Sequence, residues 1–177
     1  MFQITITDDI FGNAYNELIA YLTRRCDSFS FHLPNMGKLL VNERNASYFP
    51  EYPIGYTEEA DQEEHRIYIE SVQPLISIIS NDITKQWKDT GYLDQISSIE
   101  TEIFHALISP QTPLFFATAE SILGWKYPKL PEDPCFFSNG ICVFQCIAHE
   151  SMCYFNSADP WILEFLKKYK IDFFINN

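Results

Sequence analysis

The stretch CFFSNGICVFQCIAHESMCYFN, residues 135–156, carries the clearest structural signal in the chain. Its Asn139-Gly140 dipeptide is a strong two-residue hairpin turn, because both residues tolerate positive φ. Apolar segments lie on both sides of this turn, and a second polar break follows at residues 149–151. The stretch therefore predicts a β-meander with strands over residues 135–138, 141–148 and 152–156.

The segments outside the meander predict a mixture of helices and strands. Residues 2–6 alternate and are β-branched, which predicts a strand, and the apolar period of residues 11–25 predicts an amphipathic helix. Asp159-Pro160 is a capping pair for a last helix over residues 161–169. The other expected elements are strands at 28–32, 38–42, 98–108 and 171–175, helices at 72–79, 82–88 and 114–125, a long loop at 43–65, and a connector at 126–134; residues 65–69 fit the start of either a helix or a strand. The expected fold class is α+β, a single domain over residues 1–177, with a mixed or mainly antiparallel sheet and three or four helices.

The composition is that of a folded, acidic protein. Hydrophobic residues make up 46% of the 177 residues and charged residues 20%, unlike a disordered chain. The net charge of −12 argues against binding to nucleic-acid phosphates, which needs clustered lysine and arginine, and favours a basic partner, although acidity also serves solubility alone. The first residues resemble no signal peptide, and no stretch approaches the ~18–20 apolar residues of a membrane span. We therefore expect a cytoplasmic protein that contacts neither nucleic acid nor a membrane.

Five cysteines lie within apolar runs, which predicts small buried side chains in a reducing compartment. On one strand, Cys142 and Cys146 would lie ~13 Å apart. Zinc needs sulfur ligands at ~2.3 Å from one centre, so the spacing predicts no metal site, and we expect no cofactor. An open alternative is a cysteine-dependent enzyme built on Cys146 or Cys153 with His149 as its base. Otherwise His149 is expected to form hydrogen bonds within its own turn.

The strongest charge asymmetry lies between Glu51 and Glu70, where seven carboxylates face one cation, Arg66. Two interpretations remain open for this acidic strip. Blocks of like charge are often solvated, disordered loops. The strip is otherwise a docking surface for a positively charged protein, whose charges set the association rate while tyrosines hold the complex. The candidate partner-binding residues are Tyr52, Tyr56, Glu58, Glu59, Asp61, Glu63 and Glu64.

The run from Trp125 to Asp159 resembles a set of small bacterial proteins. Their pattern is a tryptophan, then L-P-E-D-x-C-F, a hairpin with glycine, and His-Glu before another strand. In this chain the pattern falls on Trp125, Leu130, Pro131, Glu132, Asp133, Cys135, Phe136, Gly140, His149 and Glu150. The resemblance covers about a third of the chain, which departs from the pattern at Pro134. By itself the local segment at 131–133 is expected to be a rigid lead into a strand, with acids that keep a sheet edge from pairing.

This resemblance is to immunity proteins of contact-dependent growth inhibition and polymorphic toxin systems. It implies a non-enzymatic protein that binds and neutralises a cognate toxin domain, a basic protein and in particular a nuclease. An acidic adaptor or regulatory protein that binds a basic partner unrelated to toxins is the further alternative.

Overall fold

The computed structural model describes residues 3–35, 58–91 and 99–176 of the chain. The strand expected at 38–42 and the candidate anchors Tyr52 and Tyr56 lie outside the described residues. The described strands form one antiparallel sheet in the order β3-β4-β2-β5-β6-β7-β1-β8. The strands are β1 (Gln3–Ile6), β2 (Ser28–Asn35), β3 (Ile83–Gly91), β4 (Ile99–Leu107), β5 (Glu132–Ser138), β6 (Ile141–Ile147), β7 (Met152–Phe155) and β8 (Phe173–Asn176). The helices are α1 (Gly12–Arg25), α2 (Glu58–Ile78), α3 (Thr112–Phe116), the 3-10 helix η3 (Ala148–Glu150) and α4 (Pro160–Tyr169).

The predicted meander is confirmed as β5, β6 and β7, which are consecutive in the sheet. Asn139 and Gly140 both have positive φ, +51° and +75°, as a primed two-residue turn requires. The α+β class and the mainly antiparallel sheet are confirmed as well. The first strand β1, the first helix α1, the strand β4 expected over residues 98–108 and the last helix α4 are also confirmed. The N-cap of α4, Asp159, accepts a hydrogen bond from the Trp161 backbone N–H at 3.0 Å.

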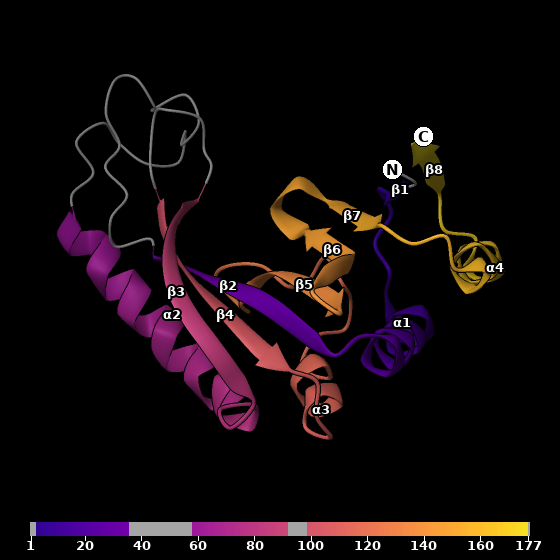
Figure 1. Cartoon of the computed structure of the whole chain (residues 1–177). Helices are drawn as coiled ribbons and strands as arrows, with labels where there is room; N and C mark the ends of the chain where they lie inside the picture. The colour runs from indigo at the N-terminus through magenta and orange to yellow at the C-terminus, as the bar shows by residue number, and fades with distance from the viewer. Residues whose placement is uncertain (1–2, 36–57, 92–98, 177) are drawn as a thin grey trace.

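Figure 1 shows how the helices lie beside the twisted sheet. Helix α2 lies alongside β3 and β4, while α1 and α4 lie at the end that carries β1 and β8. The short helix α3 contacts both α1 and α2. Its two phenylalanines, Phe115 and Phe116, are fully buried against Phe29 of β2, Phe136 of β5 and the Trp125 ring. This aromatic cluster packs α3 and Trp125 against the two neighbouring strands β2 and β5.

The helix expected over residues 82–88 is wrong, because this segment is the edge strand β3. It pairs with β4 along its length, from Ile83 opposite Ala106 to Gly91 opposite Ile99. The run contains the β-branched Ile83 and Thr84 and the aromatic Trp87, and pairing with a neighbour outweighs a weak helical period. Its charged residues suit an edge, where they discourage pairing with other chains.

The helix expected over residues 114–125 is much shorter, since α3 ends at Phe116. The chain beyond it is tied to the start of α1 instead of continuing as a helix. The backbone N–H of Gly12 donates to the Glu120 carbonyl, and the N–H of Ile122 donates to the Ile10 carbonyl, both at 3.0 Å. These long-range bonds hold Trp125 in the core.

The loop expected over residues 43–65 is wrong from residue 58 onward, because α2 begins at Glu58. The rest of that segment lies outside the described residues. Glutamate is a good helix former, and acidic residues in a first turn interact favourably with the positive end of the helix dipole. The acidic composition that suggested a solvated loop therefore also suits a helix start. Among the described residues, no helix combines the length and hydropathy needed to cross a bilayer.

Candidate functional site

Helix α2 is amphipathic and carries most of the acidic strip. Its inner face packs into the core through the buried side chains of Tyr68, Val72 and Ile76. The outer face of α2, defined here as Glu63, Arg66, Ile67 and Glu70, is exposed to solvent. The candidate residues Glu58, Glu59, Asp61 and Glu64 lie on the same helix, and their side chains lie outside the described part of the structure. The structure therefore places five of the seven predicted contact residues on one helix.

The outer face of α2 contains a three-membered ion-pair network. The Arg66 guanidinium donates to Glu63 through Nε and Nη2, at 2.9 and 2.6 Å, and to Glu70 through Nη1 at 2.6 Å. The bond from Arg66 lowers the pKa of Glu63. Exposed pairs of this kind add little to stability. Their consequence here is that Glu63 is partly neutralised, so the acidic character of α2 rests more on its first two turns.

Ile67 adds an apolar group to this face, with 54% of its surface exposed. One helical turn separates it from Glu63, and Glu70 is three residues further along, so carboxylates lie on either side of it. Protein interfaces place apolar groups inside a polar rim, and Ile67 among its charged neighbours has this arrangement. The sequence interpretation missed Ile67, although its phase in the helix, opposite Val72 and Tyr68, could have indicated it.

A second polar cluster lies where β5 begins and where the chain leaves the end of β6. The Asp133 carboxylate accepts a hydrogen bond from the Ala148 backbone N–H at 2.7 Å through Oδ1. Its other oxygen, Oδ2, lies 3.1 Å from His149 Nδ1. Glu132 accepts a bond from the Tyr127 backbone N–H at 2.9 Å through Oε1. One ligand atom from each of Glu132, Asp133 and His149 lies within 4.8 Å of the others.

Burial and charge set the protonation of this cluster. Burial raises the pKa of Glu132, and the neighbouring Asp133 raises it further, while the Tyr127 N–H and His149 act in the opposite direction. The hydrogen bond with Asp133 raises the pKa of His149 in spite of its partial burial. The cluster therefore concentrates negative charge around one imidazole.

Two sequence expectations are wrong at this cluster. His149 bonds to Asp133 of β5 and not within its own turn. Glu132 and Asp133 do not guard a sheet edge, because β5 pairs with β2 on one side and with β6 on the other. The register of the β5–β6 hairpin could have indicated this contact. Cys135 lies opposite Gln145, so the same register places residue 133 opposite residue 147, and the start of β5 lies beside the end of β6.

The cysteines are free thiols, and four of them are buried, as predicted. Cys146 and Cys153 are fully buried and face each other across β6 and β7. The hydrogen bond with Cys153 and desolvation both raise the pKa of Cys146. Cys142 differs, because it is half-buried and the bond from Cys135 lowers its pKa.

Alkylation of the native protein by iodoacetamide at neutral pH is expected to label Cys142 first. Alkylation requires both a thiolate and access; Cys146 and Cys153 are both fully buried, and the pKa of Cys146 is also raised. Peptide mass spectrometry after timed quenching gives the order, and a sample in denaturant serves as the control that labels every cysteine. Rapid labelling of Cys146 or Cys153 without denaturant would instead favour the thiol-enzyme alternative.

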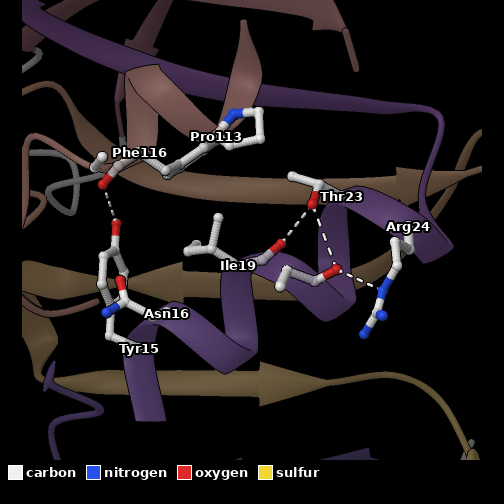
Figure 2. A pocket seen from close by; sticks show the side chains of 9 residues that line it. Tyr15, Asn16, Ile19, Thr23, Arg24, Pro113 and Phe116 are labelled. Carbon is white, nitrogen blue, oxygen red and sulfur yellow. Dashed lines mark hydrogen bonds between the residues drawn. The ribbon is translucent and has the colours of Figure 1, made fainter. Parts of the chain in front are cut away.

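A groove of about 310 Å³ lies between α1 and α3, and Figure 2 shows the side chains that line it. Three of its polar side chains form hydrogen bonds within the protein. The Tyr15 hydroxyl donates to the Phe116 carbonyl at 2.7 Å, Thr23 Oγ1 to the Ile19 carbonyl at 2.8 Å, and Arg24 Nε to the Ala20 carbonyl at 2.9 Å. These bonds stabilise the helices and their junction. The complete lining is Tyr15, Asn16, Ile19, Ala20, Thr23, Arg24, Pro113, Phe116 and Ala117.

The chain matches no family model, no curated protein and no solved structure.

Proposed function

We propose that this protein is an immunity protein, which binds and neutralises a basic toxin domain, in particular a nuclease, in the cytoplasm of the producing cell. The observation that carries the proposal is the charge of α2, with six carboxylates and one arginine between Glu58 and Glu70. This charge lies along a helix whose later turns are anchored in the core by the buried side chains of Tyr68 and Val72. A helix held in this way presents its charges without the entropic cost of ordering a loop on binding.

The mechanism is steric and electrostatic and needs no cofactor. The negative field of the chain, −12 in total, speeds encounter with a basic protein. The carboxylates of α2 then pair with lysines and arginines that a nuclease uses to hold phosphates. Ile67 supplies an apolar contact among them, and the body of the domain covers the cleft.

Co-expression tests the function directly. The C-terminal domain encoded by the gene immediately upstream is expected to arrest growth when it is induced alone in a laboratory bacterium. Growth is expected to resume when this protein is induced with it, and the two proteins should elute together from a size-exclusion column. A neighbouring domain that is harmless, or an arrest that this protein does not relieve, would shift the interpretation to an adaptor.

Neutralising part of α2 tests the binding surface separately. The triple variant E58Q/E59Q/E64Q is expected to associate with the toxin domain about tenfold more slowly at low salt, because it loses part of the steering field. Stopped-flow fluorescence measures the rate, and its dependence on salt should become weaker. The variant spares Glu63, whose charge Arg66 already offsets.

The matched control is E120Q/E164Q/D172N, which removes the same number of charges from exposed side chains outside α2. It should slow association much less. Circular dichroism and a thermal scan on both variants check that α2 remains folded, since each glutamine in the first turn forfeits about 0.3–1 kcal/mol of favourable dipole interaction. Equal slowing by both variants would assign the effect to the overall charge and not to α2.

A further inference from the structure

The three side chains at the junction of β5 and η3 come from two segments that are distant along the chain, and they converge through the hairpin register. Glu132 and Asp133 open β5, and His149 lies in the connection between β6 and β7. We propose that Glu132, Asp133 and His149 form a binding site for one divalent transition-metal ion, with zinc as the best match. This site uses none of the cysteines whose spacing argued against zinc.

The distances between the ligand atoms suit binding to one shared ion. Zinc binds histidine nitrogen and carboxylate oxygen at about 2.0–2.2 Å, so two such ligands around one tetrahedral ion lie roughly 3.4 Å apart. His149 Nδ1 and Asp133 Oδ2 lie 3.1 Å apart, close to that value. Glu132 brings a third ligand atom, and the whole set spans 4.8 Å. An ion between the three atoms would therefore require only small side-chain rotations.

Both carboxylates are held in place through one oxygen each. The Ala148 N–H fixes Oδ1 of Asp133, and the Tyr127 N–H fixes Oε1 of Glu132. The second oxygen of Asp133 faces His149 Nδ1, and a metal ion would take the place of the proton that these two atoms share. Hydrogen bonds that orient a ligand in this way are the usual support of protein metal sites. The backbone of Asp133 has a positive φ of +53°, which is uncommon for a residue other than glycine.

The charge balance also favours a cation. Asp133 is buried and Glu132 is half-buried, and both bring a carboxylate oxygen to one partly buried place. His149 is the group of opposite sign that acts on Glu132. A divalent ion would neutralise the pair more completely than one imidazolium. The His149 side chain is 51% exposed, so water can reach the ion and complete its coordination.

The ligand types narrow the choice of metal. Magnesium and calcium prefer oxygen ligands only, whereas zinc and its first-row neighbours accept imidazole together with carboxylate. Among the common ions, zinc also binds such mixed sites more tightly than manganese or iron. The expected order of affinity is therefore zinc, then manganese, then magnesium.

Isothermal titration of the full chain with zinc chloride, in a buffer that does not chelate metals, tests the site. One zinc ion per chain is expected to bind, and binding of manganese should be weaker. E132Q keeps the oxygen that accepts the Tyr127 N–H but removes the charge, and it should weaken zinc binding at least tenfold. H149A should weaken it by a similar factor, while the controls H105A and E150Q should leave it within about twofold.

A cobalt titration separates this site from adventitious binding to thiols. Cobalt held by nitrogen and oxygen gives weak visible bands, whereas a thiolate ligand adds an intense near-ultraviolet charge-transfer band. The proposal expects the first spectrum, unchanged by C142S and lost in E132Q. Failure to bind zinc, binding that survives both E132Q and H149A, or a thiolate band would each overturn the proposal.

Discussion

Replacing Phe29 by alanine is expected to lower the free energy of unfolding by about 3–5 kcal/mol, the usual cost of deleting a fully buried phenylalanine ring. Phe29 has no exposed surface and lies on β2, a central strand of the sheet. Its ring centroid lies 5.3 Å from Phe116, 5.6 Å from Phe115 and 6.0 Å from Phe136. The truncation would therefore leave a cavity where α3 packs against β2 and β5.

Urea denaturation followed by tryptophan fluorescence measures this effect. F11A is the matched control, because the same atoms are removed from a side chain that is 69% exposed. Its free energy of unfolding should change by less than about 1 kcal/mol. If F29A and F11A cost the same, the aromatic cluster is not the part of the core that supports the sheet.

Replacing Tyr15 by phenylalanine is expected to cost about 2–4 kcal/mol, although only one oxygen atom is removed. The buried hydroxyl donates to the Phe116 carbonyl at 2.7 Å and accepts from Trp125 Nε1 at 2.8 Å. Burial raises the pKa of Tyr15 well above its ordinary value, so the phenol stays neutral and can serve both bonds. Without it, an indole N–H and a carbonyl are left buried without those bonds.

Y154F is the matched control for this prediction. Tyr154 is half-buried, and its hydroxyl donates to the Met152 sulfur at 3.2 Å. Its loss should change the free energy of unfolding by about 0.5 kcal/mol. Near-ultraviolet circular dichroism should also change in Y15F, because the Trp125 ring loses its anchor. A Y15F protein as stable as the wild type would mean that the two partners find water or other groups.

The candidate sites were partly accessible to sequence reasoning. The charge of the 51–70 segment was apparent, because net charge is a property of composition. Its secondary structure was not, since the same glutamates suit a solvated loop and a helix start equally well. The pairing of Asp133 with His149 was missed for a different reason. The pairing follows from the register of β5 against β6. The sequence predicts the hairpin only from residue 135 onward, so residues 131–133 have no strand partner in that prediction.

Signals that act over a few residues were sufficient for the meander, the first helix and the capped last helix. The Asn139-Gly140 turn, the apolar period of α1 and the Asp159 cap each depend on backbone conformation within one or two turns of chain. Tertiary structure alone decided that residues 83–91 are a strand and that α3 stops at Phe116. In both segments, hydrogen bonds to distant parts of the chain, with β4 and with the start of α1, outweigh a weak local preference. The same long-range geometry brings two carboxylates and an imidazole together, because strand pairing joins residues that spacing along the chain keeps apart.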